Sequence, residues 1–206
     1  MRYLITLFVI SLIVGCNTSV KKEVTTSNSE ASSIEKKETK IMASADYSTL
    51  LVDFNCDMDT SEIAKVLEVP ESDLSIPDHT QPNKCHLQLK GFGENTAGGQ
   101  TLLMWGSYPS SKGQNKKEIK NYLKNQEEYP ANVIQHMSIA LADTKDCYIA
   151  QQPAHGRALI YNENYDTAFI LNYGRRGAFK RSEEQHEALK AKMTDLANYL
   201  LKKHRK

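Results

Sequence analysis

The 206-residue chain has almost no net charge, because its 26 lysines and arginines balance 25 aspartates and glutamates. Proteins that bind nucleic acid without sequence preference need a broad basic surface that neutralises phosphates. A formal net charge of +1 provides no such excess. The composition therefore argues against nucleic acid as a partner.

The sequence also lacks the short motifs of common metal and catalytic sites. None of its six histidines forms a His-x-x-x-His pair, and no two of its four cysteines form Cys-x-x-Cys. No Gly-x-Ser-x-Gly elbow is present, and Ser110-Ser111-Lys112 before Gly113 predicts a turn rather than a serine–lysine dyad. We expect no cofactor, no metal ion and no catalytic residue that is readable from the linear sequence.

Asp53 to Asp59 places oxygen ligands at alternate positions, as an EF-hand calcium loop does. Met58 stands where that loop requires glycine, and Ala64 stands where it requires a bidentate glutamate. The pattern instead predicts a polar turn whose aspartates cap the helix that follows.

An uncharged apolar run from Leu4 to Val14, preceded by Arg2, is typical of an export signal and is too short to span a bilayer as a helix. Its ending, Ile13-Val14-Gly15-Cys16, resembles the lipobox of bacterial lipoprotein precursors. The resemblance implies cleavage of a signal peptide, residues 1–15, and attachment of lipid to Cys16. The alternative is a simple secretory signal that is cut elsewhere, with Cys16 an incidental thiol.

Residues 16–45 begin with Cys16 and are rich in serine, threonine, lysine and glutamate, with almost no aromatic side chains. Such a segment buries too little apolar area to offset its backbone entropy. We expect a flexible tether, with a random-coil span of about 30 Å, between the lipid and a folded domain. The remaining residues, 46–206, are enough for one domain with a real core.

Apolar periodicity predicts alternating short helices and strands in residues 46–206. Helices are expected from Asp59, Thr60 or Ser61 to Leu67, over 114–129 and from Ser182 onward. Strands are expected over 85–90, 101–108, 136–142, 147–151, 157–162 and 167–173, with Gly91 to Gln100 as a long hairpin tip. The predicted fold class is α+β, an antiparallel sheet with helices packed on it.

The last helix has the clearest signals. Ser182 and Gln185 form a capping-box pattern. The residues Leu189, Met193, Leu196 and Leu200 recur at helical spacing. This apolar stripe is expected to face the core, with a partner-binding face as the alternative.

An exported protein matures in an oxidising compartment, which favours pairing of two among Cys56, Cys85 and Cys147. The sequence alone does not choose between the pairs. We favour a Cys56–Cys85 disulfide, which would join the first helix to the first strand across about thirty residues and contribute ~3.5 kcal/mol. Cys147 would then be a free, inert thiol. This layout loosely resembles domains in small bacterial lipoproteins of unassigned activity.

A basic junction, Gly174 to Arg181, connects the last strand to the last helix. Arg175, Arg176, Lys180 and Arg181 crowd together there, just before a helix N-terminus, and such places bind anions well. The alternative is a solvated loop whose charges are balanced by carboxylates such as Glu183 and Glu184. If the junction is a site, we expect lipid head groups, acidic polysaccharide or an acidic partner protein as ligand.

Together these patterns predict a non-catalytic binding or accessory protein of the bacterial cell envelope, held in a membrane by the lipid on Cys16. Asn17 is not the aspartate associated with inner-membrane retention, which favours the outer membrane. The alternative function is an envelope enzyme of hydrolase type whose site is assembled only by folding.

Labelled palmitate tests the lipid anchor. We expect label in the wild-type protein and none in Cys16→Ala, because only the thiol of Cys16 can form the thioether to diacylglycerol. Cys147→Ala, which removes a thiol elsewhere in the chain, serves as the control and should label normally. Equal labelling of wild type and Cys16→Ala would exclude lipidation at this position.

Overall fold

The computed structural model describes residues 45–78, 81, 83–129 and 137–206. These residues belong to one unit of the chain, Ile41–Lys206, and a second unit comprises Met1–Lys40. Cys16 and the predicted signal peptide lie outside the described residues. In the described part of the chain, no helix combines the length and apolar character needed to cross a membrane.

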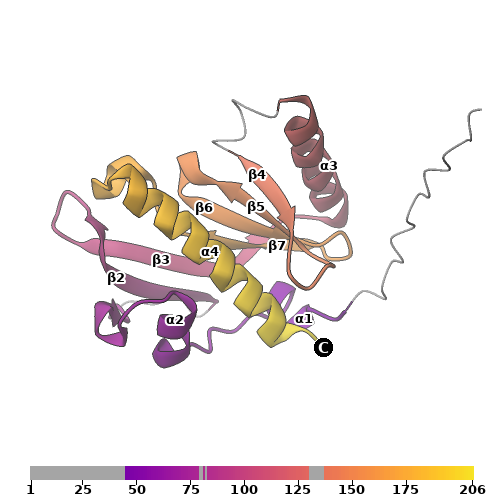
Figure 1. Ribbon diagram of the computed structural model, residues 1–206. Helices are drawn as coiled ribbons and strands as arrows, with labels where there is room; N and C mark the ends of the chain where they lie inside the picture. The colour runs from indigo at the N-terminus through magenta and orange to yellow at the C-terminus, as the bar shows by residue number, and fades with distance from the viewer. Residues whose placement is uncertain (1–44, 79–80, 82, 130–136) are drawn as a thin grey trace, which may run out of the picture. The chain divides into compact units, whose positions relative to one another are not determined.

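Seven strands form one antiparallel sheet with the order β1-β2-β3-β7-β6-β5-β4 (Figure 1). Their bounds are Leu74–Ser75 (β1), Lys84–Glu94 (β2), Gln100–Pro109 (β3), Ser138–Leu141 (β4), Tyr148–Gln152 (β5), Arg157–Tyr161 (β6) and Thr167–Asn172 (β7). Strands β4 to β7 follow one another in sequence and in space. Strand β7 then pairs with β3, which joins these four strands to β1, β2 and β3.

Helices cover both faces of this sheet. The α-helices are Ser48–Leu51 (α1), Thr60–Val66 (α2), Lys112–Glu128 (α3) and Glu183–His204 (α4), and the 3₁₀ helices are Glu71–Asp73 (η1), Pro153–His155 (η2) and Arg176–Phe179 (η3). Buried residues of α1, α2 and α4 share one core cluster, whereas those of α3 belong to a second cluster on the opposite face. The predicted α+β class is confirmed.

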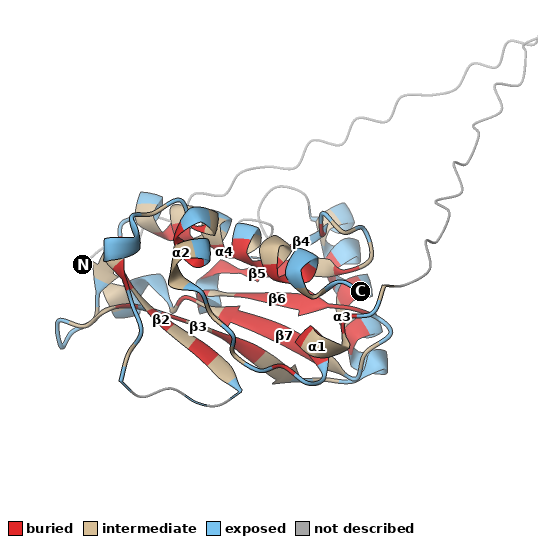
Figure 2. Cartoon of the chain, turned by 90° about the horizontal axis from the view of Figure 1, so that it is seen from below, coloured by how far each residue is buried: buried red, intermediate tan, exposed pale blue. Residues whose placement is uncertain are grey.

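The two clusters explain why the interiors of β6 and β7 are apolar on both faces. In β6, Ala158 and Ile160 belong to the first cluster, and Leu159 and Tyr161 belong to the second. Successive side chains of a strand point to opposite faces, so a strand between two helical layers needs apolar residues at every position. Figure 2 accordingly shows β6 and β7 as mostly buried.

Helix α4 contributes six buried apolar residues to the first core: Leu189, Met193, Leu196, Ala197, Leu200 and Leu201. The predicted capping box is present: the Ser182 hydroxyl accepts from Gln185 N (3.2 Å), and Gln185 Oε1 accepts from Ser182 N (2.9 Å). Leu189, Met193 and Leu196 are fully buried. The apolar stripe therefore faces the core, as predicted.

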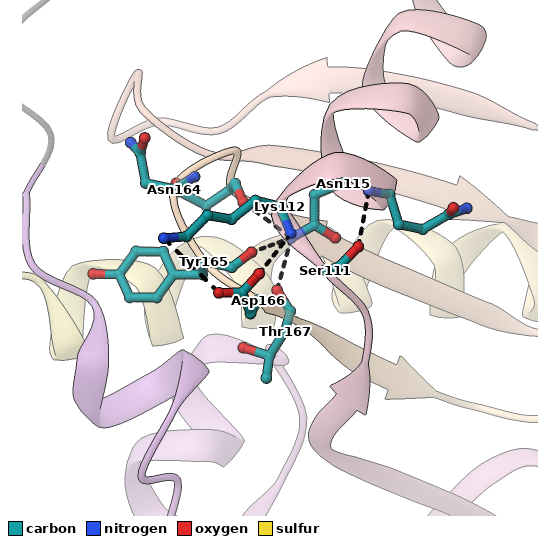
Figure 3. A network of polar contacts seen from close by, with 9 residues as sticks. Ser111, Lys112, Asn115, Asn164, Tyr165, Asp166 and Thr167 are labelled. Carbon is teal, nitrogen blue, oxygen red and sulfur yellow. Dashed lines mark hydrogen bonds and ion pairs between the residues drawn. The ribbon is translucent and has the colours of Figure 1, made fainter.

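Helix α3 begins two residues before the predicted start, because Ser111 caps it by accepting from Gln114 N (3.1 Å). One turn later, the buried Asn115 fixes the helix to the loop between β6 and β7 (Figure 3). Its amide nitrogen lies 2.8–3.0 Å from the carbonyl oxygens of Asn162, Tyr165 and Thr167. This single side chain therefore joins α3 to two carbonyls of the loop and to the first carbonyl of β7.

The hairpin between β2 and β3 differs from the prediction. Strand β2 continues through Gly91 and Gly93, which adopt positive φ of 83° and 89° at an irregularity in the β2–β3 register. The tip shrinks to a turn in which the Asn95 carboxamide oxygen accepts from Ala97 N and Gly99 N, both at 2.9 Å. Glycines that signalled a long loop in sequence instead allow a bulged strand to bend.

A disulfide joins Cys56 and Cys85, whose Cα atoms are 5.3 Å apart. Cys56 lies just before α2, and Cys85 lies on β2, so the bond fastens helix to sheet as predicted. Asp59, from the segment compared with a calcium loop, instead caps α2 by accepting from Ser61 N (2.8 Å) and Glu62 N (3.3 Å). Cys147 is free and fully buried.

Thiol alkylation without reductant tests this cysteine arrangement. Burial raises the pKa of Cys147 to about 12, so the folded protein should resist iodoacetamide at pH 8, because the thiolate is the reacting form. The test uses the mature protein, whose Cys16 we expect to be blocked by lipid. Unfolding it in urea should expose Cys147 alone to the reagent, and added reductant should then release Cys56 and Cys85 as well. Labelling of Cys56 before reduction would contradict the disulfide.

Candidate functional site

The basic junction predicted from the sequence divides into two parts with different environments. Arg175, Arg176 and Lys180 are exposed, whereas Arg181 is only 4% exposed. Arg181 therefore does not belong to an exposed anion site with the other three. The physical reason is that its guanidinium is surrounded by backbone oxygens.

Four hydrogen bonds hold the Arg181 guanidinium. Its Nε donates to Phe92 O (2.7 Å) and its Nη1 to Gly174 O (2.7 Å). Its Nη2 donates to Tyr173 O (2.6 Å) and to the Thr101 hydroxyl (2.9 Å). Burial lowers the pKa of Arg181 to about 10, which still leaves it charged at neutral pH. A buried cation bonded to carbonyls of β2 and of the β7 end is a structural element rather than a ligand-binding group.

Tight backbone contacts at two glycines place the segment that follows β7. Gly156 O accepts from Tyr173 N (2.7 Å) and Gly174 N (3.0 Å), and a Cβ at Gly156 would lie 2.0 Å from Gly174 O. A Cβ at Gly174, where φ is +74°, would overlap the Phe179 ring. Both positions therefore need glycine, and their contacts bring η3 close to the turn that contains η2.

A cleft of about 730 Å³ lies between η2, η3 and the first two turns of α4. Pro153 and Ala154 line it from η2, and Arg175, directly before η3, lines it together with Arg176 to Ala178 of η3. Helix α4 contributes Glu183, His186, Glu187 and Lys190. The structure thus brings predicted residues Arg175 and Arg176 into one concave site, and Lys180 lies outside its lining.

The charges of the cleft are largely paired. Arg176 forms an ion pair with Glu183, and Lys190 forms one with Glu187. Arg175 has no carboxylate partner among the residues that the structure describes. Because the cations of the lining outnumber its carboxylates by one, the cleft has a small positive excess centred on an exposed, planar guanidinium.

The N-terminus of α4 offers fewer free backbone N–H groups for an anion than the sequence suggested. The capping box already occupies the backbone N–H groups of Ser182 and Gln185, and hydrogen bonds from the Glu184 backbone N–H and from Ser182 lower the pKa of the Glu184 carboxyl. These side chains take the place of an external anion at the positive end of the helix dipole. Arg175 is therefore the main candidate for contact with an anion.

His186 is a member of the cleft that the sequence did not identify. Its side chain is only 5% exposed, its Nε2 lies 2.9 Å from Pro153 O, and its ring is tilted against Tyr173 with centroids 5.4 Å apart. Burial lowers the pKa of His186, so the ring is neutral at neutral pH. Its spacing from Leu189 and Met193 on the apolar stripe was the available signal that it points inward.

A second, more open cleft of about 510 Å³ lies beside α3 and includes Ile119 and Tyr148. Its lysines include Lys116, which pairs with Glu163 (3.8 Å), and Lys124, which pairs with Glu128 (3.5 Å). It contains none of the predicted site residues. Within the described ranges, no group of three or more histidine, cysteine, aspartate or glutamate side chains is arranged to hold a metal ion.

Comparison of the chain with protein-family models, curated proteins and solved structures finds no match. The cleft at the start of α4 is therefore identified as the candidate site by its geometry and charge alone.

Replacement of Arg181 by methionine tests its structural role. Arg181→Met keeps the length of the side chain but removes the guanidinium that donates to the carbonyls of Phe92, Tyr173 and Gly174, and of these Phe92 O keeps the Thr101 hydroxyl as a donor. We expect the free energy of unfolding, measured in urea, to fall by about 3 kcal/mol. The exposed neighbour gives a matched control, because Lys180→Gln should change stability by less than about 0.5 kcal/mol. An Arg181→Met protein as stable as wild type would show that the carbonyls do not depend on the guanidinium.

Proposed function

We propose that this chain is a lipid-anchored binding or accessory protein of the bacterial cell envelope, and that it holds an anionic group in the cleft between η2, η3 and α4. The anchor and the envelope location rest on the lipobox-like residues 13–16, and the outer membrane is favoured by Asn17. The binding role rests on one observation: Arg175, exposed and without a carboxylate partner among the described residues, lines a concave site.

Binding is favoured over hydrolysis by the groups that line the cleft. Its two carboxylates, Glu183 and Glu187, are both in ion pairs. Its imidazole donates through Nε2 to a backbone carbonyl and keeps its other nitrogen, Nδ1, buried, and the lining residues carry no hydroxyl or thiol. A hydrolytic site needs a nucleophile or a base free to act on substrate, and paired charges are better suited to recognition.

The cleft lies at the opposite end of α4 from the point where the described domain begins. The described domain begins beside its own C-terminus, where Asp46 N donates to Lys206 O (3.1 Å) and Lys206 N to Asp46 O (3.0 Å). The cleft is at the other end of α4, whose 22 residues extend over about 33 Å. An anchored domain would carry its cleft far from the point where the tether joins.

Charge reversal at Arg175 tests the binding role. Polyglutamate and polygalacturonate serve as probes of an acidic protein and an acidic polysaccharide. Arg175→Glu should weaken binding of whichever probe binds by at least about tenfold, because a charge-assisted hydrogen bond is replaced by repulsion. Binding to the wild type should also weaken with rising salt, since exposed charges are screened within about 8–10 Å.

Lys180→Glu is the matched control, because Lys180 belongs to the same basic segment but lies outside the cleft. It should retain most of the affinity, and both variants should unfold close to the wild-type temperature because surface charges contribute little to stability. Equal losses in the two variants would indicate a diffuse surface effect. Affinity unaffected by Arg175→Glu and by salt would exclude the cleft as an anion site.

A further inference from the structure

The imidazole of His186 has a nitrogen, Nδ1, that can accept a hydrogen bond, and an anionic group without a donor cannot satisfy it. Its Nε2 lies 2.9 Å from Pro153 O, and a carbonyl oxygen can only accept, so Nε2 carries the hydrogen of the neutral ring. Nδ1 is then an acceptor. This atom is buried and has no partner among the residues that the structure describes.

Buried polar atoms in native proteins nearly always have a hydrogen-bond partner. His186 lines the cleft, and only 5% of its surface is exposed. A ligand in the cleft that satisfies Nδ1, directly or through one bridging water, must present a donor such as a hydroxyl group. This requirement for a donor group on the ligand does not depend on Arg175 or Arg176.

The charge balance of the lining limits the ligand further. Arg176 and Lys190 have carboxylate partners within the cleft, and Arg175 has none among the described residues. One unpaired cation is neutralised by a single negative charge. A ligand whose donors are neutral hydroxyls keeps this balance, whereas a zwitterion would leave the excess positive charge in place.

The size and walls of the cleft agree with a small ring-shaped ligand. Its volume of about 730 Å³ lies within the range of small-molecule sites, roughly 300–1,000 Å³. Pro153, Ala154 and Ala178 provide short apolar side chains on which the C–H groups of a ring can pack. The polar groups are Arg175, which directly precedes η3, and His186 of α4.

We infer that the cleft binds a hydroxylated monocarboxylate, such as the uronic-acid unit of an acidic polysaccharide, with its carboxylate on Arg175 and a hydroxyl donating to His186 Nδ1. This inference rests on the proposed anion-binding function and specifies its ligand class. It favours saccharide over lipid head groups and acidic protein as the source of the anion.

Isothermal titration calorimetry of the full-length protein with four small ligands tests the inference. Glucuronate has the carboxylate and the hydroxyls, cyclohexanecarboxylate has the carboxylate on a ring of the same size, glucose has only hydroxyls, and alanine is a zwitterion. We expect glucuronate to bind at least about tenfold more tightly than each of the other three, the factor that one additional satisfied hydrogen bond provides.

Two variants assign the contacts. His186→Phe keeps a ring but removes the acceptor, so glucuronate should bind it no better than cyclohexanecarboxylate does. Arg175→Gln should weaken both carboxylates, and Lys180→Gln should weaken neither. If His186→Phe does not fold, the ¹⁵N chemical shift of wild-type His186 Nδ1 replaces it, and this shift should change with glucuronate and not with cyclohexanecarboxylate.

The outcomes separate this inference from the proposed function. Equal affinity for glucuronate and cyclohexanecarboxylate, with both lost in Arg175→Gln, would preserve anion binding and overturn the hydroxylated ligand. Tighter binding of alanine would overturn it in favour of amino acids or peptides. Absence of binding by every carboxylate, together with polyanion binding that ignores Arg175→Glu, would overturn both proposals.

Discussion

The guanidinium of Arg181 is the interaction on which the arrangement around the cleft depends. It joins β2 through Phe92 O, β3 through the Thr101 hydroxyl, and the end of β7 through the carbonyls of Tyr173 and Gly174. No other side-chain type offers five N–H donors in one rigid plane. A buried charge is costly to desolvate, and here backbone oxygens, rather than a carboxylate, offset that cost. The residue that follows, Ser182, caps α4, so the same contact fixes where the helix begins.

Helix α4 unites the core and the candidate site. From Leu189 onward its inner face packs on the sheet, and its first two turns, with Glu183, His186 and Glu187, form one wall of the cleft. A wall on a helix that is packed along its length is held rigidly, which suits recognition of a small ligand in a fixed orientation. The opposite wall, η2, begins at Pro153, directly after strand β5 ends at Gln152.

Arg175 and Arg181 show how the same residue type serves two purposes within seven residues. The exposed arginine is free to meet a ligand, whereas the buried one is occupied by the backbone. Charge clustering in sequence is equally compatible with both states. Only the path of the chain through Gly156 and Gly174, where two backbone segments touch, decides which guanidinium turns inward.

The sequence by itself determined what depends on neighbours along the chain. Apolar periodicity located α2, α3, α4 and the longer strands, the Ser182–Gln185 pair defined the start of α4, and the stripe from Leu189 to Leu200 identified its buried face. Such features follow from local hydrogen bonding and from the period of each element. The lipobox-like residues are also purely local.

Tertiary structure decided what depends on contacts between distant residues. The hairpin tip became a short turn because Arg181 and Thr101 bind the carbonyl of Phe92 and draw the glycine segment into a strand. The disulfide could be ranked from sequence but was fixed only when β2 was placed beside α2. The cleft needs Pro153, Arg175 and His186 together, and Pro153, more than twenty positions before the other two, meets them only after the sheet has formed.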